Sequence, residues 1–156
     1  MKVLMVCLGN ICRSPIAEGV LQHKCQKLGL DWKVDSAGTN GYHNGERPHH
    51  MSQAVSKLNG IDISHQRSRP FRADDFDQFD LIISMAEDVT REMRYIAGKK
   101  FDPSKVQLLL NYSFPGTHLD VPDPWARSEA AFHEVFSLID HACDALIESY
   151  RSDKQP

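Results

Sequence analysis

The feature that most constrains the fold of this chain is the alternation of short apolar runs with longer amphipathic stretches. Four apolar runs read as strands, at residues 2–6, 32–36, 79–85 and 106–110. Apolar residues recur at helical spacing over 16–28, 51–58 and 127–150, and an acidic helix is expected at 86–96. This alternation predicts a four-stranded parallel sheet flanked by helices on both faces, which is a three-layer α/β fold.

Length and charge limit the number of domains and the class of partner. A chain of 156 residues is one domain long and needs neither disulfides nor a metal to stabilise its core. We take residues 1–156 as one domain whose tail frays from about residue 152. The 18 Lys and Arg residues against 21 Asp and Glu residues leave a net charge of −3. Such a chain lacks the broad basic surface of proteins that bind nucleic acid or anionic membranes, so local groups must hold any bound anion.

The cysteines and the hydropathy pattern indicate the compartment. Four cysteines, at positions 7, 12, 25 and 143, are too few and too unevenly spaced for the disulfide framework of a small secreted domain. No apolar run reaches the length of a secretory segment or the ~20 residues of a membrane span. We expect a cytoplasmic protein without membrane insertion. The histidines show no metal-ligand spacing, so neither a metal nor another cofactor is expected.

The loop between the first strand and the first helix has the composition of an anion cradle. It starts at Cys7 and opens a helix near Pro15, so unpaired backbone N–H groups and the positive end of the helix dipole face one point. Gly9 and Asn10 tolerate the positive φ angles that a tight ring of amides requires. A nucleotide-binding loop would need a second glycine and a lysine, which are missing here.

Two side chains of this loop have the spacing for chemistry on a phosphoryl group. Arg13 lies six residues after Cys7, so a loop curled around one tetrahedral dianion brings the thiol and the guanidinium to it together. The positive surroundings favour a Cys7 thiolate, to which Ser14 can donate a hydrogen bond. The alternative is a buried cysteine at a strand end beside a surface arginine, which the strand before the loop and the helix after it disfavour.

The segment C-L-G-N-I-C-R-S-P-I-A-E, residues 7–18, resembles the phosphate-binding loop of the low-molecular-weight protein tyrosine phosphatases. The resemblance covers nearly the whole chain, because blocks at 36–39, 60–65, 79–85 and 121–124 fall in the order and spacing of that family. Trp125 and Ala126 stand where animal members often carry two tyrosines, which indicates a bacterial form.

The resemblance implies a role for each residue of the site. Cys7 is the nucleophile, Arg13 clamps the phosphate and Asp123 is the general acid. Ser14 supports the thiolate, and Asn10 shapes the loop. The remaining residues expected to bind or support the phosphate are Leu8, Gly9, Ile11 and Cys12 in the loop, with Ser36 and His65 as braces for Asn10.

The proline-rich loop 111–125 carries the candidate proton donor. Pro122 and Pro124 restrict the backbone on both sides of Asp123 and hold its carboxyl above the phosphate loop. A phenol leaving group benefits from such a donor at neutral pH. Asp120 is the rival candidate, and a turn-forming Asp-Pro pair is the alternative without a catalytic role.

Aromatic residues in the same loops are candidates for the pocket wall. Tyr42 and Trp125 each sit in a loop at the expected mouth, and ordinary packing is the alternative for both. Ile11 favours an aryl ester, since phosphoarginine phosphatases that resemble this loop tend to carry Thr there. The basic run 67–72 either receives acidic substrate flanks or is a solvated loop.

The cysteines outside the catalytic position have two different expectations. Cys12 is five residues from Cys7 in one curled loop, which suggests a reversible disulfide that protects Cys7 from irreversible oxidation. Cys25 and Cys143 lie in amphipathic stretches and are expected in the core.

These features predict hydrolysis of protein phosphotyrosine through a phosphocysteine, with inorganic phosphate as product and no metal. In a bacterium, a tyrosine-phosphorylated kinase is a family-level expectation for the substrate. Two alternatives are an arsenate reductase of the same fold and a non-catalytic phosphopeptide-binding module. The reductase would use further cysteines in the middle of the chain, where this sequence has none, and the module would not need both Cys7 and Asp123.

Overall fold

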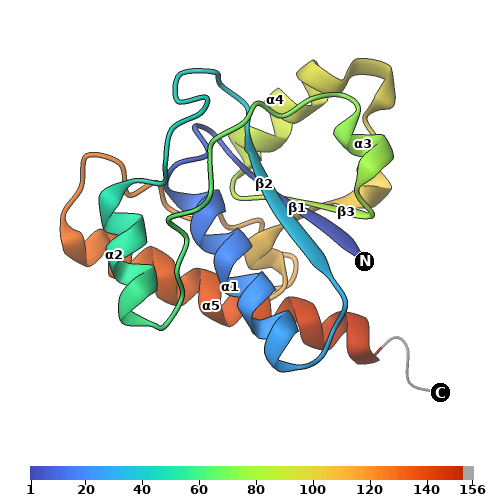
Figure 1. The fold of residues 1–156 in the computed structure, drawn as a ribbon. Coiled ribbons are helices and arrows are strands. Elements are labelled where there is room, and N and C mark those ends of the chain that lie inside the picture. The colour runs from blue at the N-terminus through green and yellow to red at the C-terminus, as the bar shows by residue number, and fades with distance from the viewer. Residues whose placement is uncertain (153–156) are drawn as a thin grey trace.

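All four strands pair in parallel in one sheet at the centre of the molecule. The computed structural model describes residues 1–152, and the sheet within them has the order β2-β1-β3-β4 (Figure 1). The strands are β1 (Lys2–Cys7), β2 (Lys33–Gly38), β3 (Leu81–Ser84) and β4 (Val106–Leu108). The predicted α/β fold class and four-stranded parallel sheet are confirmed. The fraying expected of the tail concerns residues 153–156, which lie outside the described residues.

The helices form the two outer layers. Three helices, α1 (Arg13–Lys27), α2 (His50–Leu58) and α5 (Glu129–Ser152), pack together on one face of the sheet, as Figure 1 shows. The one-turn α3 (Asp75–Gln78) and α4 (Glu87–Ala97) cover the other face. The structure differs from the expected elements in α3, which was not predicted, and in the fourth strand, which ends at Leu108 because Leu109–Asn111 forms a 3₁₀ turn.

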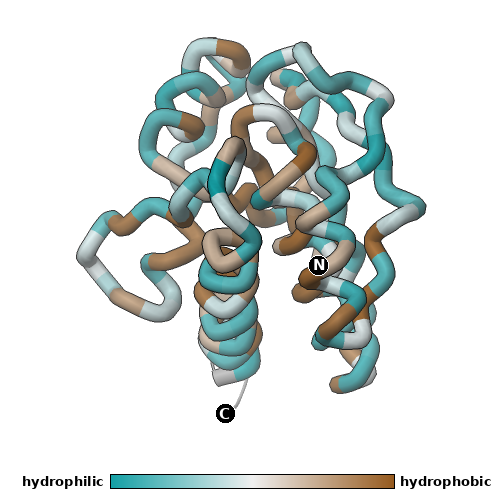
Figure 2. The backbone as a smooth tube through the Cα atoms, turned by 90° about the vertical axis from the view of Figure 1, so that its left-hand side faces the viewer, coloured by the Kyte–Doolittle hydropathy of each residue, from teal (hydrophilic) through white to brown (hydrophobic). Residues whose placement is uncertain are grey.

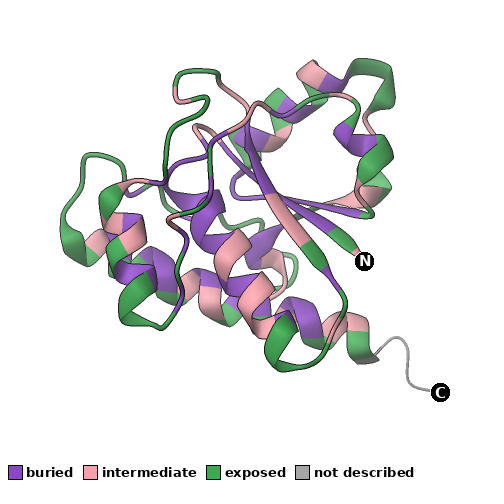
Figure 3. Ribbon diagram, viewed as in Figure 1, coloured by how far each residue is buried: buried purple, intermediate pink, exposed green. Residues whose placement is uncertain are grey.

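Both faces of the sheet are buried, because side chains alternate along each strand. In β1, Val3, Met5 and Cys7 join the core under α1, α2 and α5, whereas Leu4 and Val6 join the core under α3 and α4. Figure 3 shows strands that are buried over most of their length and helices whose buried residues alternate with exposed ones. The helical turns in Figure 2 carry hydrophilic and hydrophobic residues next to each other, as amphipathic helices should. A strand buried on both faces therefore reads as a continuous apolar run.

The carboxyl ends of β1, β2 and β3 bring the functional loops together. The backbone N–H groups of Thr39 and Met85, which follow β2 and β3, donate to the carbonyls of Cys7 at 3.0 Å and Val6 at 3.0 Å. Val121 N–H then donates to the Met85 carbonyl at 2.8 Å and ties the loop 111–125 to the same edge. Ligands of parallel sheets bind at this edge. No helix within residues 1–152 combines the length and the apolar character that a membrane crossing requires.

Candidate active site

The phosphate loop connects the last residue of β1, Cys7, to the first residue of α1, Arg13. Asn10 has a φ angle of 56°, so the predicted left-handed turn lies at this residue. Gly9 serves the loop in another way, because an added Cβ would lie 3.1 Å from the His43 ring. The loop also leans on Gly38 at the end of β2, where an added Cβ would lie 2.9 Å from the Leu8 carbonyl oxygen. The curl of the loop thus depends on one left-handed residue and on close backbone packing.

Cys7 is 2% exposed and lies at the start of this loop, with its sulfur bonded within the loop. Ser14 Oγ lies 3.0 Å from Sγ, and the Asn10 backbone N–H donates to Sγ at 3.3 Å. The N-terminus of α1 points at the same place, since Arg13 begins the helix. Hydrogen-bond donors and a helix N-terminus stabilise a thiolate relative to a thiol.

Asn10 is held from three sides. Its Nδ2 donates to Ser14 Oγ at 2.8 Å and to Ser36 Oγ at 2.9 Å, and its Oδ1 accepts from the Arg69 backbone N–H at 3.0 Å. The expected contact with Ser36 is therefore present. The expected contact with His65 is absent. The His65 side chain is exposed, and the third hydrogen bond to Asn10 comes from the main chain of Arg69 instead. The family resemblance implied that His65 braces Asn10, but in the structure the backbone of Arg69 takes this place.

Arg13 faces the proline-rich loop. Its side chain is 6% exposed, and its guanidinium donates to the Val121 carbonyl at 3.0 Å and lies 3.9 Å from Asp123 Oδ2. The other Asp123 oxygen accepts from the Trp125 backbone N–H at 3.0 Å. Bonding to Val121 fixes the direction of the guanidinium, and the short turn at Trp125 fixes the carboxyl above it.

The rival candidate Asp120 has a different task. Its Oδ1 accepts from the backbone N–H of Glu87 at 2.9 Å, at the first residue of α4. A carboxylate at this position satisfies an unpaired helix N–H and favours the helix dipole. Asp120 does not line the pocket described next, whereas Asp123 does.

These residues surround a pocket of about 340 Å³ that opens to solvent. Tyr42 and Trp125, which are 87% and 50% exposed, stand at its mouth as expected. Ile11, predicted to lie inside the loop, is 7% exposed and belongs to the lining. The lining consists of Cys7, Leu8, Gly9, Ile11, Cys12, Arg13, Asn40, Tyr42, His43, Asp123 and Trp125.

His43 and His49 support the aromatic wall and were not singled out in the sequence. The His43 and Trp125 rings lie 5.5 Å apart, and His43 Nδ1 contacts the Glu46 carboxylate. His49 places its ring edge-on to Trp125 at 5.5 Å and stacks on Phe132 at 4.9 Å. No local pattern identifies these residues, because the rings meet through contacts between three separate loops and helices.

The four cysteines are free and buried. Burial raises the pKa of Cys12 to about 12 and that of Cys25 to about 11, and burial also raises the pKa of Cys143. These three groups are therefore neutral thiols near pH 7. Cys25 and Cys143 are 0% exposed, which confirms them as core residues, whereas Cys12 shares the pocket with Cys7. Among residues 1–152, no three His, Cys, Asp or Glu side chains are grouped so that they could hold a metal ion.

Comparison with known proteins gives a consistent result. A family model described as low molecular weight phosphotyrosine protein phosphatase matches residues 2–156. The low molecular weight protein-tyrosine-phosphatase YfkJ of Bacillus subtilis is 39% identical over 156 residues, which cover 99% of this chain and 98% of that protein. The human low molecular weight phosphotyrosine protein phosphatase is 38% identical over 150 residues, which cover 94% of each protein.

Solved structures agree with this relationship. The crystal structure of YfkJ from Bacillus subtilis matches with a TM-score of 0.90 and covers 99% of this chain and 97% of that chain. A YwlE arginine phosphatase mutant with a phosphorylated active-site serine matches with a TM-score of 0.89 at 25% identity, over 99% of this chain and 98% of that chain. The match over residues 2–156 and the full-length relatives show that this chain belongs to the low molecular weight phosphotyrosine protein phosphatases, a family of cysteine-based hydrolases.

Proposed function

We propose that this enzyme hydrolyses phosphotyrosine in proteins through a phosphocysteine formed on Cys7. The observation that carries the proposal is the convergence of Cys7, Arg13 and Asp123 on one pocket with aromatic residues at its mouth. A buried sulfur beside donors, a fixed guanidinium and a carboxyl are the three groups that a two-step phosphoryl transfer needs. Inorganic phosphate is the second product.

In the first step, the Cys7 thiolate attacks phosphorus from the floor of the loop. A sulfur–phosphorus bond forms, and the bond between phosphorus and the phenolic oxygen breaks with its electron pair on oxygen. Asp123, as a carboxylic acid, gives its proton to this oxygen, so that tyrosine leaves as a neutral phenol. Arg13 and the loop amides stabilise the equatorial oxygens.

In the second step, the Asp123 carboxylate takes a proton from a water molecule, which attacks phosphorus. The sulfur–phosphorus bond breaks, the electron pair returns to Cys7 as thiolate, and phosphate is released. The 3.0 Å contact of Ser14 Oγ with Sγ supports this step, because a hydroxyl that donates to sulfur stabilises the departing thiolate. The residue that acts as the acid in one step is thus the base in the next.

The walls of the pocket favour an aromatic phosphate ester. Trp125 and Tyr42 can contact the two faces of a phenyl ring, and Ile11 adds an apolar surface within the loop. A phosphoserine leaves this surface without a partner. Because the YwlE relative carries the name arginine phosphatase, phosphoarginine is the substrate against which the preference must be measured. A tyrosine-phosphorylated protein, in a bacterium a tyrosine kinase, is the expected partner.

The two alternative functions find less support. An arsenate reductase relays oxidation to further cysteines, but Cys25 and Cys143 are both 0% exposed in the core. A phosphopeptide-binding module has no use for a carboxyl held beside Arg13 at 3.9 Å. Free cysteines at all four positions also suit the reducing cytoplasm that we propose as the compartment.

The leaving group of the substrate tests the role of Asp123. We expect Asp123→Ala to lower kcat for phenyl phosphate about 10²- to 10⁴-fold, and far less for aryl phosphates with strongly acidic leaving groups, which need no proton. Equal losses on both would remove Asp123 from the acid role. Asp120→Ala is the matched control, since it alters the cap of α4 and should leave the dependence on leaving group unchanged.

The nucleophile and the substrate class are tested together with a chelator present. Cys7→Ser should abolish turnover and still bind inorganic phosphate, as measured by calorimetry. Wild-type enzyme should cleave phosphotyrosine peptides faster than phosphoserine and phosphoarginine peptides of the same sequence. Reduction of arsenate, or activity that disappears with the chelator, would contradict the proposal.

A further inference from the structure

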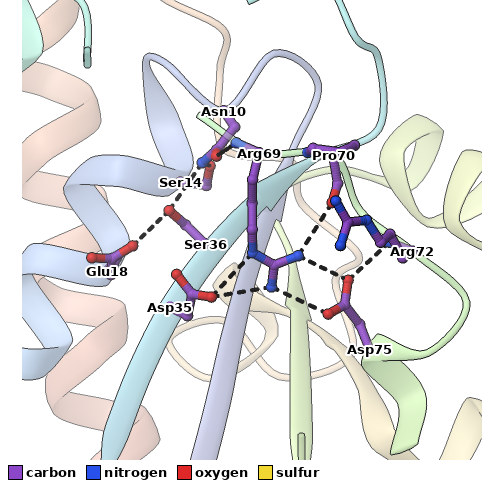
Figure 4. Close-up of polar contacts among 9 residues, drawn as sticks. All are labelled: Asn10, Ser14, Glu18, Asp35, Ser36, Arg69, Pro70, Arg72 and Asp75. Carbon is purple, nitrogen blue, oxygen red and sulfur yellow. Dashed lines mark hydrogen bonds and ion pairs between the residues drawn. The ribbon is translucent and has the colours of Figure 1, made fainter. Parts of the chain in front are cut away.

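The shape of the phosphate loop depends on a residue far from it in sequence. Asn10 carries the left-handed turn with a φ angle of 56° and is 2% exposed. Its carboxamide accepts from Arg69 N–H at 3.0 Å, while its amide group reaches Ser14 and Ser36 (Figure 4). Since only the carbonyl side of the carboxamide can accept, the Arg69 N–H determines which way this group faces. It thereby aims the amide group at Ser14, whose hydroxyl contacts the Cys7 sulfur.

The main chain around Arg69 is paired with the end of β2. Gly38 N–H donates to the Arg69 carbonyl at 2.9 Å, and Phe71 N–H donates to the Gly38 carbonyl at 2.7 Å. Gly38 and Pro70 form an isolated parallel bridge. Three residues thus extend the sheet edge next to the phosphate loop, and a shift of this segment along β2 would carry the Arg69 N–H away from Asn10.

The Arg69 side chain locks this segment in place. Its Nε and one terminal nitrogen each lie 3.1 Å from an oxygen of Asp35, in the middle of β2. Its terminal nitrogens also form a bidentate pair with Asp75 at 3.2 Å, and one of them donates to the Pro70 carbonyl at 3.2 Å. Figure 4 shows the guanidinium between the two carboxylates. Asp75 is 7% exposed and also accepts from Arg72 N–H at 2.8 Å.

We propose that Arg69 is a positioning residue for the reaction, acting through Asn10 and Ser14 on the Cys7 sulfur. The planar guanidinium fork joins β2 to α3 and fixes the register of residues 69–71, and this register presents the Arg69 N–H to Asn10. The proposal rests on the proposed function, since it takes Cys7 as the nucleophile. Arg69 does not line the pocket and makes no hydrogen bond to the Cys7 sulfur, so its effect on the reaction is exerted through the loop.

The first test compares three substitutions in the same segment. We expect Arg69→Gln to lower kcat for p-nitrophenyl phosphate about 10- to 100-fold. We also expect it to raise the pH at which the rate of Cys7 alkylation by iodoacetamide reaches half of its maximum. Arg69→Lys should lose most of the same activity, because one ammonium group cannot replace a fork between two carboxylates. Arg72→Gln removes an exposed cation three residues away and should stay within about twofold of wild type.

A double-mutant cycle separates positioning from a general loss of stability. Asn10→Gly removes the side chain but keeps a residue that adopts positive φ. If Arg69 acts through Asn10, Arg69→Gln should have a much smaller effect on kcat in the Asn10→Gly background than in wild type. Independent effects of the two substitutions would overturn the proposal. So would an Arg69→Gln enzyme with a lowered unfolding midpoint but wild-type kcat and an unchanged alkylation profile.

A second variant and two readouts that need no turnover cover the cases in which Arg69→Gln does not fold or the enzyme has another substrate. If Arg69→Gln does not fold, Asp35→Asn leaves the buried Asp75 pair intact and should show the same changes in weaker form; wild-type behaviour of Asp35→Asn and Arg69→Lys would refute the inference. The alkylation profile and the affinity for inorganic phosphate do not depend on turnover. If wild-type enzyme failed to cleave phosphotyrosine, the proposed function would fall while these two readouts would still decide the role of Arg69.

Discussion

Glu18→Gln should remove a large part of the pH dependence of stability between pH 5 and pH 8. Glu18 lies on α1, where its carboxylate accepts a hydrogen bond from Ser36 Oγ at 2.7 Å. Its pKa is raised from the ordinary 4.5 to about 7, chiefly because the carboxyl is buried and also because of the nearby charge of Asp35, against the opposing effects of the Ser36 hydrogen bond and of Arg69. The partly buried carboxyl is therefore mostly protonated in the folded protein below pH 7.

The direction of the effect follows from where the proton is held. Between pH 4.5 and pH 7, the unfolded chain releases the Glu18 proton while the folded chain keeps it, so the free energy of unfolding falls as the pH rises. The stabilisation is complete below the unfolded pKa and is lost as the pH passes the folded pKa. At 1.36 kcal/mol per pH unit the total loss is about 3 kcal/mol, of which about 2.5 kcal/mol falls between pH 5 and pH 8.

Urea unfolding of wild type and Glu18→Gln at pH 5, 6, 7 and 8, followed by circular dichroism, measures this loss. We expect the difference in unfolding free energy to move in favour of the variant by about 2.5 kcal/mol from pH 5 to pH 8. Glu134→Gln, at an exposed position of α5, controls for the removal of a solvated carboxylate. A difference that stays constant with pH, or that moves toward wild type as the pH rises, would show that Glu18 ionises readily in the folded protein and would refute the reasoning.

Three other substitutions probe the pocket and the loop. Gly38→Ala should lower kcat by about 10²-fold, because its Cβ would lie 2.9 Å from the Leu8 carbonyl oxygen and displace the loop, whereas Gly41→Ala meets only an atom at 3.5 Å. Trp125→Ala should lower kcat/KM for phosphotyrosine peptides about 5- to 30-fold, which corresponds to about 1 to 2 kcal/mol of lost contact with the phenyl ring. It should leave the affinity for inorganic phosphate, measured by inhibition, unchanged. In Cys12→Ser, we expect inactivation by peroxide that thiols do not reverse. A sulfenic acid on Cys7 then lacks the neighbouring thiol with which it would condense to a disulfide, releasing water. Full recovery with thiols would exclude a protective role for Cys12.

Local pattern predicted the parts of the molecule that local physics determines. The run at residues 2–6 and the helical spacing over 16–28 placed the loop that starts at Cys7 between a strand and a helix, and in the structure that helix begins three residues earlier than expected, at Arg13. The prolines around Asp123 likewise indicated a restrained carboxyl, and the structure places it 3.9 Å from Arg13. These features depend on residues close in sequence, so composition and spacing are enough to predict them.

The bracing of the loop could not be predicted in the same way. From sequence, the basic run at 67–72 either binds acidic substrate flanks or is a solvated loop. Neither description fits Arg69, which lies between carboxylates 34 residues before it and 6 residues after it. His65, the brace that the family resemblance implies, is exposed, and the backbone N–H of Arg69, four residues later, meets Asn10 instead. Only the pairing with β2 at Gly38 settles which residue meets the loop.

The arrangement of charges explains how a chain with a net charge of −3 can bind a dianion. Arg69 lies close to the phosphate loop, but Asp35 and Asp75 neutralise it, so it contributes structure and little field. Among the residues that line the pocket, Arg13 is the one arginine or lysine, and it works with the backbone amides and the N-terminus of α1. The positive potential of these groups is confined to the neighbourhood of the loop, because salt screens it over about 10 Å. A single phosphoryl group that enters the pocket meets all of these groups at once, so we expect the chain to bind an isolated phosphate through a few concentrated donors and not through a broad basic surface.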